Sequence, residues 1–240
     1  MVCGAASRSV VRMTGLTVPL LLSLKVAAWA TVFATLLGVA AAFGLTRWRS
    51  SWCDFVDSVL TLPLVLPPTV MGYYLLVLVG RRGWLGALLE KWGIQLVFTW
   101  QGAVLAATVV AFPLVLKAAR AAFNDVDPKF ENAARVLGVG ESALFFRVTL
   151  PLALRGIFAG VLLAFARALG EFGATLMIAG SIPGRTQTLS IAIYEAVQAG
   201  DDSLANTLVL VTSVTCIAVL WIASRLLPVY SRGSRNRGRS

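Results

Sequence analysis

Charged residues are scarce in this chain, and histidine is missing altogether. Only 13% of the 240 residues are charged, whereas 58% are hydrophobic. A soluble domain carries roughly 25% charged residues, so the composition excludes an ordinary soluble protein and indicates a membrane protein. The lack of histidine also removes His-dependent catalytic triads and most zinc sites.

Cysteine pairs and nucleotide-binding loops are absent as well. Cys3, Cys53 and Cys216 lie far apart and form no CxxC pair, so we interpret them as three unrelated thiols. The chain contains no GxxxxGK[ST] loop with which to hold nucleotide phosphates. If the protein works against a gradient, another subunit must therefore supply the energy.

Long apolar runs fill most of the sequence. Four runs contain no charged residue at all, and a fifth, at 156–184, is interrupted only by Arg167, Glu171 and a break around Pro183. Each run can reach the ~20 residues that a helix needs to cross ~30 Å of hydrocarbon. The runs do not alternate as barrel strands do, and backbone in lipid must satisfy its own hydrogen bonds. We predict an all-α membrane protein, a bundle of about five transmembrane helices forming one domain over residues 1–240, with spans at about 19–46, 58–80, 95–118, 152–181 and 203–227 and a cytoplasmic loop at about 119–151.

Positive charge is distributed unequally between the two sides that five spans define. With the C-terminus inside, thirteen Lys and Arg lie in cytoplasmic segments and six in outer segments. The positive-inside rule therefore predicts the N-terminus outside and the C-terminus inside, although Arg8 and Arg12 count against it. The net charge of +10 includes a basic tail, 231–240, which directly follows a span. We interpret the tail as an anchor on the anionic lipid bilayer and expect no nucleic-acid partner. The first apolar run is too long for a signal peptide and is read as a retained helix.

The loop between the third and fourth spans has the signals of a short helix. Asp127 followed by Pro128 predicts a helix start, with Asp as N-cap and Pro at the first helical position. The helix should run over 130–137, and Gly138 and Gly140 should end it, because glycine commonly lies just past a helix end. The longest cytoplasmic connection is therefore structured.

This helix has features of a docking site. Ala133 and Ala134 are small enough to let the backbone of a partner approach, and the aromatic pair at 145–146 could anchor the two at the membrane surface. A second short helix is expected from about Glu141, before Pro151 opens the next span. The alternative is a solvated helix with nothing docked on it.

Two interrupted regions lie near or within the spans. Pro63, Pro67 and Pro68 each remove a backbone donor from the second span, which should be kinked or broken there. The prolines form either a fixed kink or a hinge or cavity wall. The segment 182–200 is too interrupted to cross the membrane, and we predict a turn followed by a short helix or re-entrant piece near the outer face.

Arg167 and Glu171 are ionisable residues inside a predicted span. Being four residues apart on a helix, they share a face and can form an ion pair. Ionisable groups in a span are costly, so both should face the bundle interior. The pair is either a structural salt bridge or part of the path of an anion, since Arg suits the geometry of oxyanions.

The cytoplasmic loop resembles the EAA loop of bacterial ABC importer permeases, whose pattern is EAA-x3-G-x9-I-x-LP. Nine residues separate Gly138 from Val148, and Leu150 and Pro151 follow at the spacing of the pattern. Val148 replaces Ile, and Asn132 stands where the pattern has Glu, with the acid one position earlier. In that family the loop docks into a groove on the ATPase subunit, and the resemblance implies this role for Glu131, Ala133, Ala134, Gly138, Leu150 and Pro151.

Two further stretches, 62–86 and 166–201, resemble the permease subunit of molybdate ABC transporters, and the likeness extends from about residue 20 to 225. LGEFGA at 169–174 is shared with sulfate permeases and indicates only the oxyanion branch. IPGRTQTLSIAIY at 182–194 is more specific to the molybdate type. The resemblance thus indicates a particular family of permeases, whereas the composition indicates only a membrane protein.

The resemblance implies a non-catalytic permease in a bacterial plasma (inner) membrane. Two copies would line one pathway, each docking an ATP-binding cassette ATPase, with an extracytoplasmic oxyanion-binding protein delivering molybdate. No cofactor is expected on this chain, because ATP and Mg would be held by the ATPase. The alternatives are a sulfate, thiosulfate or tungstate permease of the same architecture, and an ATP-independent anion channel or secondary transporter. An intramembrane enzyme lacks support, since the chain has no His, metal cluster or convincing paired acids.

Overall fold

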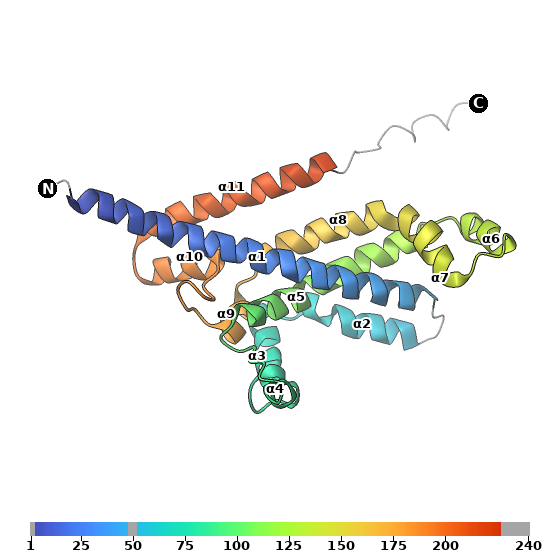
Figure 1. The fold of residues 1–240 in the computed structure, drawn as a ribbon, viewed down its shortest axis with the longest axis horizontal. Coiled ribbons are helices and arrows are strands. Elements are labelled where there is room, and N and C mark those ends of the chain that lie inside the picture. The colour runs from blue at the N-terminus through green and yellow to red at the C-terminus, as the bar shows by residue number, and fades with distance from the viewer. Residues whose placement is uncertain (1–2, 48–51, 227–240) are drawn as a thin grey trace.

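The computed structural model describes residues 3–47 and 52–226, and every regular element within these ranges is a helix. The prediction of an all-α bundle is confirmed. Three long helices run in one direction along the molecule: α1 (Cys3–Arg47), α5 (Trp100–Asn124) and α11 (Asp202–Leu226) (Figure 1). Two run back, α2 (Trp52–Val65) and α8 (Leu150–Leu169). The shorter elements are α3 (Pro68–Val79), α4 (Trp84–Glu90), α6 (Pro128–Val136), α7 (Glu141–Leu144), the π-helical turn η1 (Phe145–Thr149), α9 (Gly173–Ala179) and α10 (Leu189–Gln198).

The number of crossings agrees with the prediction of about five. Within the described residues, four helices are long and apolar enough to span a membrane, and α2 with α3 makes a fifth if the bent pair is one interrupted span. The first turns of α1 and the last turns of α11 lie toward opposite ends of the molecule (Figure 1), as an odd number of crossings requires. The basic tail at 231–240 lies outside the described residues.

Small side chains form the seam between α5 and α1. Ala30 of α1 and Ala103 and Ala107 of α5 are fully buried in one cluster. A Cβ built on Gly38 would lie 3.0 Å from Val115 Cβ, so this glycine lets the two helices approach closely. Helices in lipid associate largely through such close packing, which makes α5 the central helix of the bundle.

The second predicted span is broken at its prolines. Helix α2 ends before residues 66–67, and α3 starts at Pro68 after a bend of 112°. Pro63 lies within α2 and does not end it. Asp57 ties α2 to α5 through ion pairs with Lys117 and Arg120. The expected single span at 58–80 is therefore two helices, because consecutive prolines at 67 and 68 remove the donors that would continue α2.

The fourth predicted span also differs from expectation. It was predicted to run continuously over 152–181, but the helix ends at Leu169 and a new helix, α9, begins at Gly173. Its other end is longer than predicted, since α7, η1 and α8 form one apolar rod over Glu141–Leu169. The amide of Leu150 bonds the carbonyl of Phe145, and this wider π-type turn accommodates Pro151 without a break.

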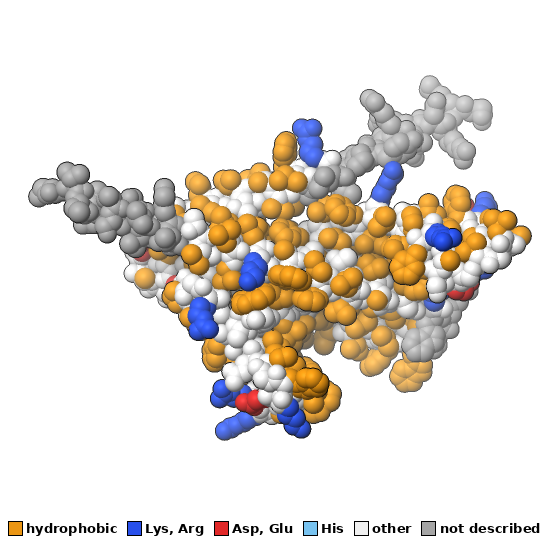
Figure 2. All heavy atoms as spheres, viewed as in Figure 1, with side chains coloured by type: hydrophobic (Ala, Val, Ile, Leu, Met, Phe, Trp, Pro, Cys, Tyr) orange, Lys and Arg blue, Asp and Glu red, His pale blue; other side chains and the backbone are white. Residues whose placement is uncertain are grey.

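The last part of the chain packs on the outside of the bundle. A turn at 183–186 leads into α10, as predicted, and the Ser23 hydroxyl of α1 accepts a 2.8 Å hydrogen bond from the amide of Leu189. Helix α11 leaves most of its apolar side chains exposed. Figure 2 shows hydrophobic side chains over the flanks of the long helices and a gathering of Lys and Arg on the lobe that contains α4.

Candidate functional site

Helix α6 stands at one end of the molecule, beside the ends of α1 and α5 (Figure 1). It begins as predicted, because the Asp127 carboxylate accepts a 2.9 Å hydrogen bond from the amide of Lys129 and Pro128 occupies the first turn. It ends at Val136, two residues before Gly138, whose φ of +79° is readily adopted only by residues without a bulky side chain. A Cβ on Gly138 would meet nothing within 4 Å, so the helix end is open to a partner.

The outer face of α6 carries several exposed apolar side chains, beside the exposed Lys129. Phe130, Val136 and Leu137 are 56%, 88% and 82% exposed, and Ala133 between them is exposed too. Ala134, which follows Ala133, is buried. Exposed apolar side chains gathered on a short helix outside the long apolar rods are typical of an interaction surface.

The inner face of α6 is fastened to the bundle by charged groups. Glu131 accepts a 2.6 Å hydrogen bond from the Thr149 hydroxyl, and Arg135 Nε lies 2.8 Å from Glu141 Oε1. Glu141 also pairs with Arg47 at the end of α1, with 2.6 Å between Oε2 and Nη1. The hydrogen bond to Glu141 raises the pKa of the Arg135 guanidinium above its ordinary value, although arginine is protonated in proteins in any case. These contacts join α6 to the end of α1 and to the α7–α8 rod.

The sequence analysis identified Glu131 as a member of this network. It did not identify Arg47 and Glu141, which pair with each other. No local signal connects these last two, which are 94 residues apart. Leu150 and Pro151, predicted as part of the docking loop, lie at the base of the α8 rod rather than on the apolar face of α6. Of the two aromatic residues expected to anchor the docked pair at the membrane surface, Phe145 is partly buried, with its ring 4.2 Å from that of Phe43, and Phe146 is exposed.

The two broken spans meet at their breaks. A Cβ on Gly173, the first residue of α9, would lie 3.1 Å from the Cβ of Pro68, the first residue of α3. A Cβ on Gly72 would lie 2.9 Å from Ala174 Cα and 2.7 Å from Met177 Cβ. Both glycines are thus needed for the close approach of α3 and α9. The structure therefore brings the break at Pro67 and Pro68 into contact with the LGEFGA motif at 169–174.

Arg167 and Glu171 lie beside this junction and form the predicted ion pair, with 2.7 Å between Nη1 and Oε2. Glu171 lies in the break after α8 rather than on the helix, which corrects the expected geometry. Its other oxygen accepts a 2.9 Å hydrogen bond from the amide of Ala174, and its side chain is only 1% exposed. Glu171 thus fastens the break, while the side chain of Arg167 is 32% exposed.

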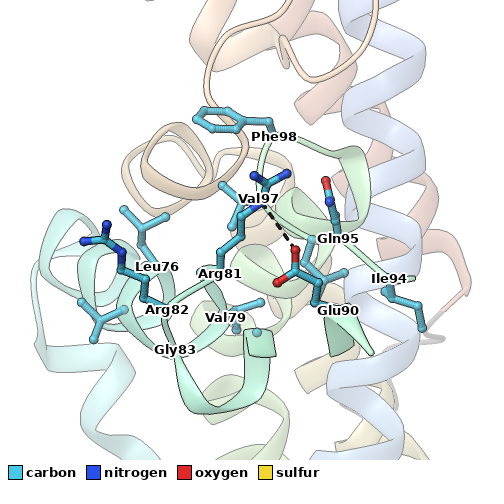
Figure 3. Close-up of a pocket in the computed structure, with 14 residues that line it drawn as sticks. Leu76, Val79, Arg81, Arg82, Gly83, Glu90, Ile94, Gln95, Val97 and Phe98 are labelled. Carbon is cyan, nitrogen blue, oxygen red and sulfur yellow. Dashed lines mark ion pairs between the residues drawn. The ribbon is translucent and has the colours of Figure 1, made fainter. Parts of the chain in front are cut away.

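A hollow of about 640 Å³ lies at the end of α3, on the lobe that contains α4 (Figure 3). Arg81 Nε lies 3.9 Å from Glu90 Oε1 across it, and Arg82 points away from that pair. Sequence reasoning assigned no role to this lobe. Among residues 3–47 and 52–226, no group of three or more Cys, Asp or Glu is placed to hold a metal ion.

Comparison with known proteins extends these observations. A family model described as binding-protein-dependent transport system inner membrane component matches residues 34–235. The chain is 47% identical to the molybdenum transport system permease protein ModB of Escherichia coli K12, covering 85% of this chain and 91% of that protein. It is 40% identical to ModB of Haemophilus influenzae (89% and 96%) and 37% to the sulfate transport system permease protein CysW of Synechococcus elongatus (84% and 70%). A solved structure of the MetNI methionine ABC transporter shares the fold, with a TM-score of 0.71 at 16% identity over 90% of this chain and 95% of that chain.

Proposed function

Because the chain belongs to the family of binding-protein-dependent transport system inner membrane components, we propose that it is the permease subunit of an ATP-driven molybdate importer. It is a multi-pass inner membrane protein. The observation that carries the proposal is α6, a short helix with an exposed apolar face that is fastened to two of the spanning rods. The permease would change between two conformational states, and ATP hydrolysis would take place on other subunits.

The cargo is assigned from the relatives, since molybdate, tungstate and sulfate are all small tetrahedral dianions. The chain is 47% and 40% identical to two permeases named for molybdenum and 37% identical to one named for sulfate. This difference favours molybdate. Selection among the anions would reside mainly in an extracytoplasmic binding protein, because a pathway that held its cargo tightly would release it about tenfold more slowly for every ~1.4 kcal/mol of trapping.

Coupling to ATP would pass through α6. An ATP-binding cassette ATPase, which holds ATP and Mg, would receive the face of Phe130, Val136 and Leu137. Two copies of the permease would line one pathway, and closure of the two ATPases would move both α6 helices together. The ion pairs of Arg47 and Arg135 with Glu141 would carry this movement into α1 and α8.

The proposed orientation has the N-terminus outside and the C-terminus inside. The charge count assumes that the end of α1 and the α6 loop lie on the same side of the membrane. The Arg47–Glu141 pair supports this assumption, because it brings the two segments together. The lobe that contains α4 would then face outward, where its hollow and the exposed Arg81 are available to the binding protein.

Uptake of labelled molybdate into vesicles that contain the assembled transporter tests the proposal. We expect uptake that requires ATP, strong competition by excess tungstate and much weaker competition by excess sulfate. Competition by sulfate as strong as that by tungstate would assign the chain to the sulfate branch. Uptake that proceeds without ATP would indicate a channel or secondary transporter.

A further inference from the structure

Lys25 is a cation on an apolar helix with no ion pair among the described residues. It lies within the span of α1 that covers residues 16–47, and its side chain is exposed. Its Nζ lies 3.7 Å from the centroid of the Trp100 ring, a cation–π contact that holds the ammonium group against α5. A charge on an apolar span is costly unless it reaches polar surroundings or a counter-charge, so the exposed Lys25 ammonium favours a position beside the polar headgroups or an anion.

The surroundings place Lys25 at the level of the membrane interface. Trp100 is the first residue of α5, directly after Thr99, whose hydroxyl caps the helix by accepting a 3.2 Å hydrogen bond from Gly102. Trp29 follows Lys25 by one helical turn and is half exposed. Tryptophan and lysine together are typical of the zone where lipid headgroups lie.

A groove of about 530 Å³ begins beside Lys25, between α1 and α5. Trp29, Phe33 and Leu37 line one wall at intervals of four residues, and Trp100, Val104 and Thr108 line the other in the same way. The helices are parallel here, because Lys25 contacts Trp100 and Phe43 contacts Phe123 further along. The groove therefore extends along both helices, away from Lys25 and into the hydrocarbon.

The walls of the groove consist mostly of apolar side chains. The Thr108 hydroxyl donates a 2.7 Å hydrogen bond to the Val104 carbonyl of its own helix, so it needs no other partner. The other polar groups are the exposed amide of Gln101 and the indole N–H groups of Trp29 and Trp100, and these residues belong to the part of the groove next to Lys25. One end of the site thus suits an anion, and the rest suits a hydrocarbon chain.

We propose that this groove binds an anionic phospholipid, with the phosphate at Lys25 and an acyl chain between Trp29, Phe33 and Leu37 and the facing wall of α5. Charge complementarity selects this occupant: a helix from a second copy would fill the apolar groove but leave Lys25 without a counter-charge. A zwitterionic lipid fills the groove and brings its own cation close to Lys25. The site requires only that the chain spans a bilayer, so it stands independently of the proposed cargo.

Quenching of tryptophan fluorescence by lipids with brominated acyl chains tests the site directly. The full-length chain, with the subunits that co-purify with it, is stripped of lipid in detergent and titrated with brominated phosphatidylglycerol or phosphatidylcholine. We expect about fivefold tighter binding of phosphatidylglycerol, as one interfacial lysine provides. The double variant Trp29→Phe and Trp100→Phe should lose the quenching component that shows this preference.

Two substitutions separate the charge from the fold. Lys25→Gln should bind both lipids equally, and Lys25→Arg should retain the preference. Lys91→Gln is the matched control, since it removes another exposed lysine outside the spans and should leave the preference intact. A preference that survives Lys25→Gln, or quenching that does not depend on Trp29 and Trp100, would overturn the proposal. So would efficient disulfide formation between two copies through Phe33→Cys in a chain without native cysteines, because it would place a second copy on the groove.

Discussion

The α6 end and the α3–α9 junction are held together by different kinds of contact. At α6, ion pairs among exposed or half-buried side chains join Arg47, Arg135 and Glu141. At the junction, Gly72 and Gly173 bring two helices into close contact, and the buried carboxylate of Glu171 fastens the break between α8 and α9. One region depends on screened charges and the other on steric fit.

The difference teaches which region can adjust and which must move as a unit. Exposed ion pairs contribute little to stability because water screens them, so changes at α6 should cost little folding free energy even where they weaken its connection to α1 and α8. Inserting atoms into a tight contact typically costs about 1–3 kcal/mol, so α3 and α9 should stay together during transport. Changes at the junction should therefore reduce stability, and changes at α6 should reduce coupling.

Glu171→Leu should have the largest effect on stability. It removes the partner of a half-buried guanidinium and the acceptor for the Ala174 amide, and breaking a buried pair costs about 3 kcal/mol or more. Thermal unfolding in detergent measures the loss. Glu171→Gln, which keeps an acceptor for Ala174, should lose less, and Arg155→Gln, on the exposed side of α8, should be neutral. A Glu171→Leu protein as stable as the parent would show that the carboxylate does not hold the break.

Gly72→Ala should lower the free energy of unfolding by about 1–3 kcal/mol, because its Cβ would lie 2.9 Å from Ala174 Cα. Gly44→Ala is the matched control, since nothing lies within 4 Å of its Cβ and alanine favours a helix. Comparing the two melting curves isolates the contact between α3 and α9. Equal curves would mean that the two helices can separate freely.

Gly138→Trp should leave the protein inserted but stop transport-coupled ATP hydrolysis in reconstituted vesicles. The substitution places a large ring at the open end of α6 and adds about 1–2 kcal/mol of backbone strain at positive φ. Gly138→Asn separates these causes, because Asn tolerates this conformation and adds little volume. The docking surface would have to be sought elsewhere if the Trp variant kept normal activity.

Glu131→Gln should give a milder loss of coupling, measured as molybdate imported per ATP hydrolysed. The amide oxygen can still accept the Thr149 hydroxyl, whereas the charge facing Arg135 is lost. Glu131→Leu, which removes both contacts, should couple less well than Glu131→Gln. Identical ratios in the two variants would show that fastening α6 to η1 does not matter for transport.

Labelling with a membrane-impermeant thiol reagent should show which side of the membrane the α4 lobe and the α6 end each face, without changing activity. In a chain whose native cysteines are replaced, Lys91→Cys on the α4 lobe should react from outside, and Gly140→Cys beside α6 should not. Both positions are exposed. Labelling in the opposite order would invert the proposed orientation.

Features that depend on neighbouring residues were predictable from the sequence. Apolar runs of about 20 residues place the spans because the hydrocarbon core has a set thickness. The start of α6 at Asp127 and Pro128 and its end two residues before Gly138 follow from capping and from the φ that glycine permits. The ion pair of Arg167 with Glu171 was predictable as well, since four residues bring the two groups within reach.

Only the tertiary structure decided which distant segments meet. Gly170 directly follows α8 and is a local signal for its end, but the apolar residues on both sides of 170–172 favoured a continuous helix over it. The break is fastened by Glu171 and packs where Gly173 meets Pro68, more than 100 residues away. In the same way, Glu141 belongs to the docking end because Arg47 faces it from α1. Local signals determine where a helix can begin and end, whereas close packing and ion pairing depend on how the remote surfaces of the bundle fit together.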